Sequence, residues 1–383
     1  MENPTEKVTC TRPPTFTPLH TPCEHVPDAP HDLTGEVHPH AKPAQRLYSS
    51  QYIIFSDLDH TVIPLDTRGI DRFAQLIRSI QTKGQCSVRF VPISGRSSDY
   101  VRCFCHTLRT NFRLLGPDLD GVIDLASGEQ GATVIDCDKS YHVEYLGDAD
   151  EADLKLKVVA LLQTLPPALK AIIRDEPAKL YTCSLHITTE AAATMSPDQK
   201  QECFAAVQAH MEAGLGKGVA VYEMSHKTLE VMPRSVSKSH ALRHLLRHYH
   251  AQTDVSALSY SGDAPNDREC IEYVTRLAEV PGVCVHAFLP SNAHPSLSSS
   301  ALEGCKDRLK CPHECVEKAP AEGRPYWHGV MDLIEAALEA GTLLGQGQGQ
   351  GQGQGDRGGV SGKDDLTEAL RSPSLGSVVK QQV

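Results

Sequence analysis

Short apolar segments alternate with amphipathic ones along most of the chain, and this alternation limits the possible folds more than any other feature. The run YIIFSD at 52–57 predicts a buried strand. Apolar residues then recur with a helical period at Ile70, Phe73, Leu76, Ile77 and Ile80. SVRFVPIS at 87–94 predicts a second strand, and a helix follows over 97–108, with Ser97 or Ser98 as its N-cap. Strands and helices in alternation favour an α/β fold with a doubly wound parallel sheet.

The middle of the chain departs from this alternation. Helical patterns near 150–165 and 199–213 are mixed with apolar runs that predict strands, namely IIRDEP, LYTCSLHITT, VAVYE and KTLEVM. The alternation then resumes with the strands ALSYSG and VCVHAF and with helices near 237–250, after Pro265 and near 330–340. We therefore predict a core in two parts, 49–136 and 234–342, with an inserted α+β cap at 137–233 over the ends of the parent sheet.

Both ends of the chain differ from the interior in composition. Residues 1–48 are rich in Pro, His and Thr without a helical or strand period, so we expect a disordered arm. Gly and Gln alternate from 345 to 355, and a stretch rich in Gly, Ser and charged residues follows. We expect residues 343–383 to be a disordered low-complexity tail.

Charge and hydropathy exclude several classes of protein. The 383 residues carry 37 Lys and Arg against 48 Asp and Glu, and this net charge of −11 would repel a nucleic acid. The apolar runs are far shorter than the ~20 residues that cross a bilayer, so no membrane partner is expected. Neither a signal peptide nor an Arg-rich transit peptide is recognisable, which favours a cytoplasmic protein. Thirteen cysteines at irregular spacing indicate mostly reduced thiols.

Acidic residues follow two of the predicted strands. Asp57 and Asp59 end the first strand in FSDLDHTVI, and SGDAPND at 261–267 ends a later one. Ligands bind at the carboxyl ends of strands in open α/β sheets, and buried carboxylates need a compensating cation. Oxygen ligands of this kind suit Mg²⁺, and Asp263, Asn266 and Asp267 can complete its shell.

Two further segments are suited to phosphate. ISGR at 93–96 lies where a strand gives way to a helix, so the Ser94 hydroxyl and the following N–H groups can hold a phosphate oxygen. Lys238 stands near the start of a predicted helix, where its charge would neutralise a phosphate and hold a nucleophile in place.

Taken in this order, DLDHT, SGR, the lysine and GDAPND resemble the haloacid dehalogenase (HAD) superfamily, in the branch with a large cap after the third core strand. The resemblance implies an aspartyl-phosphate mechanism with Mg²⁺, in which Asp57 is the nucleophile and Asp59 the general acid and base. It implies metal binding by Asp57, Asp59, Asp263 and Asp267, and phosphate binding by Ser94, Gly95, Lys238 and Asn266.

Two subgroups of that branch resemble different parts of the chain. SDLDHT and GDAPND are similar to sucrose-phosphate phosphatases and to the Cof-type group. LEVMPRSVSKSHAL at 229–242, with Glu176, Lys179 and His186, resembles trehalose-6-phosphate phosphatases, although Ser239 replaces a glycine and their GDDxTDE motif is absent. We therefore expect a Mg²⁺-dependent phosphatase for a phosphorylated sugar of the sucrose-6-phosphate or trehalose-6-phosphate type. Its cap would contact the sugar through Glu176, Lys179 and Glu230.

Other interpretations of the sequence stay open. A phosphomutase on a hexose phosphate would use the same two aspartates, and a non-catalytic module would bind the sugar phosphate without hydrolysing it. Cys305, Cys311, His313 and Cys315 have an unusual spacing for a zinc site, so a structural zinc is the lesser alternative. His244 and His248 lie one helical turn apart without an evident third ligand, which favours a solvated helix face.

Overall fold

The computed structural model describes residues 48, 50–63, 65–148, 151–225, 228–297, 316–320, 326–344, 366–367 and 369–370. The predicted N-terminal arm lies outside these residues except for Tyr48, and so does most of the predicted tail. The cysteine and histidine cluster at 305–315 also lies outside them. The disordered arm and the structural zinc, which was the lesser alternative for the cluster, therefore stay predictions.

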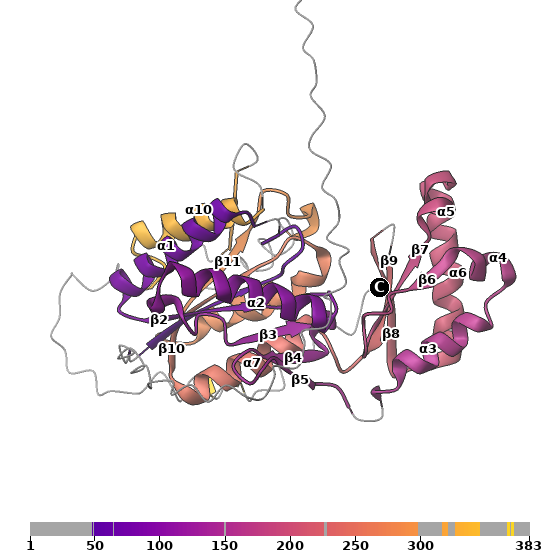
Figure 1. The fold of residues 1–383 in the computed structure, drawn as a ribbon, viewed down its shortest axis with the longest axis horizontal. Coiled ribbons are helices and arrows are strands. Elements are labelled where there is room, and N and C mark those ends of the chain that lie inside the picture. The colour runs from indigo at the N-terminus through magenta and orange to yellow at the C-terminus, as the bar shows by residue number, and fades with distance from the viewer. Residues whose placement is uncertain are drawn as a thin grey trace, which may run out of the picture. The chain divides into compact units, whose positions relative to one another are not determined.

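Five parallel strands form the central sheet, in the order β12-β11-β10-β1-β2. Figure 1 labels β2, β10 and β11 of this sheet. These strands are β1 (Ser50–Ser56), β2 (Ser87–Pro92), β10 (Asp254–Ser261), β11 (Cys284–Leu289) and β12 (Val316–Lys318). Every neighbouring pair is parallel, which confirms the predicted α/β class. β1 lies between β10 and β2, so its end is flanked by the ends of two other strands.

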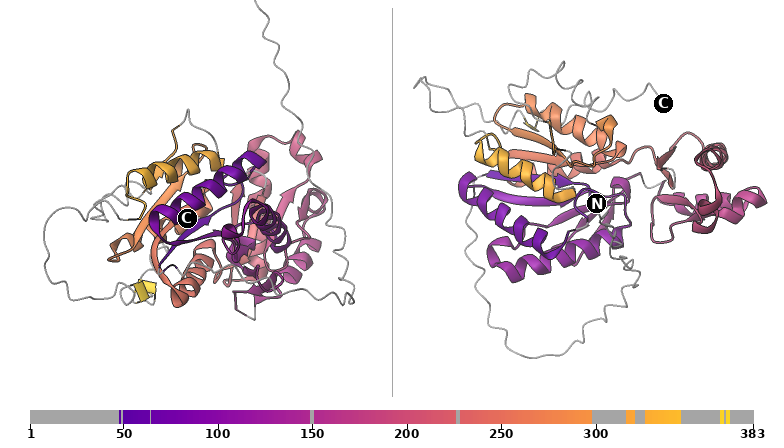
Figure 2. Two further views of the ribbon diagram at one scale, coloured as in Figure 1. Left: turned by 60° about the vertical axis from the view of Figure 1, so that its left-hand side comes forward. Right: turned by 90° about the horizontal axis from the view of Figure 1, so that it is seen from above.

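Helices cover both faces of this sheet. The side chains of β1 alternate: Tyr52 and Ile54 pack with α1 (Thr67–Gly84), α2 (Ser98–Leu115) and α10 (Tyr326–Glu339). Ile53 and Phe55 pack on the opposite face with α7 (Lys238–Gln252) and α8 (Arg268–Arg276). Figure 2 shows α1 and α10 side by side, where Arg72 forms ion pairs with two acidic residues of α10. None of the described helices is long and apolar enough to cross a membrane.

A small antiparallel sheet in the order β3-β4-β5 follows α2, and sequence patterns did not predict it. Its strands are β3 (Leu125–Gly128), β4 (Thr133–Asp136) and β5 (His142–Tyr145). Each has only four residues, and β5 has no fully buried position, so no apolar run marks it. Because β5 pairs with β4, this sheet continues across the predicted domain boundary at residue 137.

The cap contains a four-stranded antiparallel sheet in the order β6-β7-β9-β8. The strands are β6 (Ile173–Asp175), β7 (Cys183–Ile187), β8 (Val219–Ser225) and β9 (Thr228–Pro233). The helices are α3 (Leu154–Gln163), α4 (Pro167–Ile172), α5 (Thr189–Thr194) and α6 (Pro197–Leu215). Phe204, Val207 and Met211 of α6 are buried in the same apolar cluster as Leu185 and Val231. The cap therefore has a hydrophobic core of its own, as an α+β insert requires.

Part of the predicted tail packs against the core. Leu366 and Leu370 are 1% and 5% exposed and belong to the apolar cluster of α7 and α8. The Arg247 guanidinium donates to the carbonyl of Leu370 at 2.6 Å, and the His250 ring lies 2.9 Å from the Thr367 hydroxyl. The prediction of a wholly disordered tail is therefore wrong for these residues, because two leucines four apart share one helical face within a polar stretch.

Candidate active site

Parallel pairing brings the predicted acidic segments together. β1 and β10 are neighbours in register, and the N–H of Asp57 donates to the carbonyl of Ser261 at 2.8 Å, just beyond the paired strands. Asp57 therefore leaves β1 beside the point where Gly262 and Asp263 leave β10. This position at the carboxyl end of the sheet is where open α/β sheets bind ligands.

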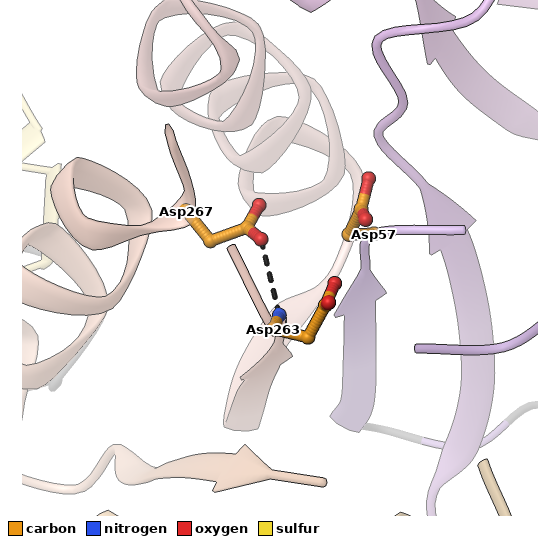
Figure 3. Close-up of side chains that lie close together, drawn as sticks. All are labelled: Asp57, Asp263 and Asp267. Atoms are coloured by element: carbon orange, nitrogen blue, oxygen red, sulfur yellow. Dashed lines mark hydrogen bonds between the residues drawn. The ribbon is translucent and has the colours of Figure 1, made fainter. Parts of the chain in front are cut away.

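Three carboxylates meet at that edge. One oxygen from each of Asp57, Asp263 and Asp267 lies within 4.8 Å of the other two (Figure 3). Burial raises the pKa of Asp57 to about 8, against the opposing effect of Lys238. Burial and the charge of Asp267 raise the pKa of Asp263 to about 6. Three carboxyl groups this close together in a buried space repel one another when ionised, which favours the binding of a cation between them.

Lys238 is the positive charge of this cluster. Its ammonium donates to Oδ1 of Asp57 at 2.7 Å and to Oδ1 of Asp267 at 2.8 Å, and its side chain is 2% exposed. It occupies the first residue of α7, whose N-cap is Ser237. Burial alone would lower the pKa of Lys238, but the two carboxylates outweigh burial and raise it. Lys238 is therefore a fixed ammonium directed at Asp57.

Asp267 uses both oxygens to hold its neighbours. Oδ1 accepts from Lys238 and from the Tyr260 hydroxyl at 2.7 Å, and Oδ2 accepts the N–H groups of Asp263 and Ala264 at 3.1 Å each. Figure 3 shows the bond from Asp263. A Cβ on Gly262 would lie 2.5 Å from the Asp267 carboxyl carbon, so only glycine leaves room for this turn. Asp267 thus positions Lys238 and the loop after β10.

The Asp59 carboxylate lies outside this group of three. Arg96 binds it through two hydrogen bonds, from Nε and Nη2, each 2.8 Å long. The guanidinium also lies over the Tyr100 ring, 5.1 Å from its centroid. Asp59 was predicted both as a general acid and as a metal ligand. In this structure its side chain is engaged by Arg96 instead, because ISGR follows the neighbouring strand β2.

The predicted phosphate-binding residues lie along the same edge. Ser94 is fully buried, and its hydroxyl accepts the N–H of Arg96 at 3.2 Å. Asn266 donates to Oε1 of Gln130 at 3.1 Å. A Cβ on Gly95 would lie 2.3 Å from Nε2 of the same glutamine, so Gln130 packs directly on Gly95. The sequence did not predict a role for Gln130, which is marked there only by the adjacent Gly131.

The cap residues predicted to contact a sugar divide into two groups. Lys179 and Glu230 form an ion pair 2.7 Å long, each side chain being 2% exposed, and the Ser184 hydroxyl donates to the second oxygen of Glu230. Burial raises the pKa of Glu230, although Lys179 opposes this. Glu176 is half-buried, and the proximity of His186, 3.9 Å away, lowers its pKa. Of these predicted contacts, only Glu176 is accessible.

Comparison with known proteins gives one family. Residues 179–285 match the family model described as haloacid dehalogenase-like hydrolase. This match confirms the resemblance to that superfamily in the matched region and, at that level, the prediction of a hydrolase. None of the curated proteins matches the sequence.

Several solved structures are similar to this chain at low sequence identity. The sucrose-phosphatase of Synechocystis sp. PCC6803 is 17% identical with a TM-score of 0.45, over 77% of this chain and 99% of that one. The trehalose-6-phosphate phosphatase of Aspergillus fumigatus is 16% identical with a TM-score of 0.40, over 76% and 95%. The C-terminal domain of a Candida albicans trehalose synthase regulatory protein is 15% identical with a TM-score of 0.47, over 63% and 84%. Likenesses this distant say nothing about a substrate.

Proposed function

We propose that this protein is a Mg²⁺-dependent phosphatase that hydrolyses a sugar phosphate monoester through an aspartyl phosphate on Asp57. The observation that carries the proposal is the placement of Lys238, whose ammonium bridges Asp57 and Asp267 beside Asp263. The Lys238 ammonium opposes the rise in the pKa of Asp57, and a bound cation would lower this pKa further, so that Asp57 would be ionised and its oxygen nucleophilic. The fixed ammonium can also stabilise a transferring phosphoryl group.

The chemistry of the donor set fits Mg²⁺. All three clustered side chains are carboxylates, which are the hard oxygen ligands that Mg²⁺ prefers. Both oxygens of Asp267 are already engaged, whereas Oδ2 of Asp57 and Oδ2 of Asp263 accept no hydrogen bond from any described residue. Asp57 and Asp263 would therefore hold the ion. Bound there, Mg²⁺ would neutralise phosphate charge and orient the phosphoryl group.

The side chains of this chain supply the bond-making steps of the proposed reaction. A carboxylate oxygen of Asp57 forms a bond to phosphorus as the bond from phosphorus to the sugar oxygen breaks. Asp59 donates a proton to the departing oxygen, and then accepts one from the water that attacks the phosphorus of the aspartyl phosphate. Phosphate leaves, and both carboxyl groups return to their starting forms. A carboxylate paired with Arg96 carries no proton, so Asp59 must leave Arg96 and take up a proton from solvent before it acts as the acid.

The sugar assignment rests on the motifs in the sequence. SDLDHT and GDAPND favour a sucrose-6-phosphate type of substrate, whereas the segment 229–242 favours a trehalose-6-phosphate type. Lys179 and Glu230 neutralise each other inside the cap, so we assign them no contact with the sugar in this arrangement. Glu176 stays a candidate for such a contact, because it is accessible and its charge acts on Arg96 next to Asp59.

Phosphate release from a panel of substrates tests the proposal. The panel contains sucrose-6-phosphate, trehalose-6-phosphate and hexose monophosphates, each with Mg²⁺ and with a chelator. We expect Mg²⁺-dependent release, fastest from one disaccharide phosphate. An isomeric sugar phosphate formed without free phosphate would indicate a phosphomutase, and binding without either product would indicate a non-catalytic module.

A further inference from the structure

The turn at Glu129–Gly131 has an unusual backbone. Glu129 and Gln130 have positive φ angles of 51° and 59°, and Gly131 follows with a φ of 90°. Residues other than glycine rarely adopt such angles, and these angles persist only where the surrounding structure imposes them. All three residues are buried, so solvent exposure does not explain the conformation.

This turn contacts three of the four segments that carry the proposed site residues, namely those of Ser94, Lys238 and Asn266. The N–H groups of Glu129 and Gln130 donate to the carbonyls of Arg96 and Ser94, at 2.7 Å and 3.0 Å. A Cβ on Gly131 would lie 2.1 Å from the carbonyl oxygen of Ser237, the residue before Lys238. The Gln130 side chain packs on Gly95 and accepts from Asn266.

The same turn holds the cap through one carboxylate. Glu129 is fully buried, and its oxygens accept the N–H groups of Leu180, Tyr181 and Thr182, at 2.8 to 3.2 Å. The Ser98 hydroxyl donates to the same side chain. Among the described residues no lysine, arginine or histidine forms an ion pair with Glu129, so its binding partners are N–H and O–H groups alone. Successive N–H groups of this kind form a concave site for an anion.

We propose that Glu129 and Gln130 form a latch that couples the cap to the catalytic site. Glu129 holds the cap loop 180–182 in place, and Gln130 holds Asn266 against Gly95. Because the two residues are adjacent in one constrained turn, a displacement of the cap loop is transmitted to the phosphate-binding residues. Both are positioning residues. The inference that Glu129 holds the cap loop depends only on the hydrogen bonds described above. The effect of the latch on turnover rests on the proposed phosphatase function.

Hydrogen exchange of the intact protein tests the first half of the latch without any substrate. The three N–H groups precede β7, and Glu129 is their acceptor, so the amides of Tyr181 and Thr182 should exchange at least about tenfold more slowly than in an unfolded chain. In Glu129→Gln this protection should fall by about tenfold or more, while Leu185 in β7 stays protected. The matched control is Glu202→Gln, an exposed cap residue, which should change nothing.

Three results would contradict the proposal that Glu129 holds the cap loop 180–182 in place. They are unprotected amides at 181 and 182 in the natural protein, unchanged protection in Glu129→Gln, and a loss spread equally over β7 and β9. The natural protein gives an answer even if Glu129→Gln does not fold. None of these results depends on phosphatase activity, so failure of the latch is distinguishable from failure of the proposed function.

Steady-state kinetics test the proposed coupling between the cap loop and the catalytic site. Gln130→Ala should keep the protection at 181 and 182 and lower kcat. Glu129→Gln should lower kcat as well as raise KM for the sugar phosphate, because release of the cap loop also displaces Gln130. A Glu129→Gln protein that loses the protection at 181 and 182 but keeps the natural kcat would contradict the coupling.

Discussion

Lys238 Nζ lies 2.7 Å from Oδ1 of Asp57, although the two residues are 181 positions apart in the sequence. The contact joins the end of β1 to the first residue of α7, on either side of the whole cap insert. Both groups are almost completely buried, and Asp267 receives a second hydrogen bond from the same ammonium. An ion pair enclosed in this way is a poor source of stability but a well-positioned charge for chemistry.

Replacement of the proposed nucleophile should remove activity and leave the fold. Asp57→Asn keeps the shape of the side chain, removes its nucleophilic charge, and leaves Lys238 paired with Asp267. We expect phosphate release to fall by at least about 10³-fold, with an unchanged circular dichroism spectrum.

The matched control for that variant is Asp71→Asn, at an exposed position of α1. It should retain full activity. Normal turnover by Asp57→Asn, after mass spectrometry has excluded deamidation, would contradict the proposed chemistry.

Removal of Asp263 should weaken metal binding. Mg²⁺ that binds only the folded state raises the melting temperature, and the rise depends on the ratio of its concentration to Kd. Because Asp263→Asn removes one of the two carboxylates with a free oxygen, we expect a higher Mg²⁺ concentration for half the maximal rise in Tm. A Mg²⁺ titration by differential scanning fluorimetry checks this. An identical response of natural protein and variant would exclude Asp263 as a ligand.

The position of the acidic site could largely be predicted from the order of the strands and the residues that follow them. Parallel strands end at one edge, so the sequence was enough to bring Asp57 together with Asp263 and Asp267. The partners of Asp59 and of Glu230 were not predictable in the same way. Arg96 reaches Asp59 from the loop after β2, and Lys179 meets Glu230 across 51 residues once β7 and β9 pair. Such contacts depend on register and side-chain direction, which no local pattern records.

The buried pair in the cap should matter for stability rather than for substrate binding. Lys179→Met would leave the Glu230 charge buried without its partner, which typically costs about 3–5 kcal/mol. The double variant Lys179→Met/Glu230→Leu should regain much of this loss, because neither charge remains. Urea unfolding followed by circular dichroism measures both. If Lys179 instead contacts the sugar, Lys179→Met would raise KM with no loss of stability.

The C-terminal segment should stabilise the core. A chain that ends after Leu344 lacks Leu366 and Leu370, whose burial beside α7 we expect to contribute about 1–3 kcal/mol after the entropic cost of ordering them. A chain that ends after Arg371 keeps both leucines and serves as the control. Thermal unfolding should give a lower Tm for the first chain only. Equal Tm values for both would show that these leucines contribute no net stability.

The central claim is that a phosphoryl group is transferred to Asp57, and acid quenching tests it most directly. The protein is mixed with the ³²P-labelled sugar phosphate that the panel selects, stopped with acid within one turnover, and digested for peptide mapping. We predict label on the peptide that contains Asp57 and none on the Asp57→Asn protein. Turnover that proceeds without labelled protein, or with label on a different peptide, would contradict the account.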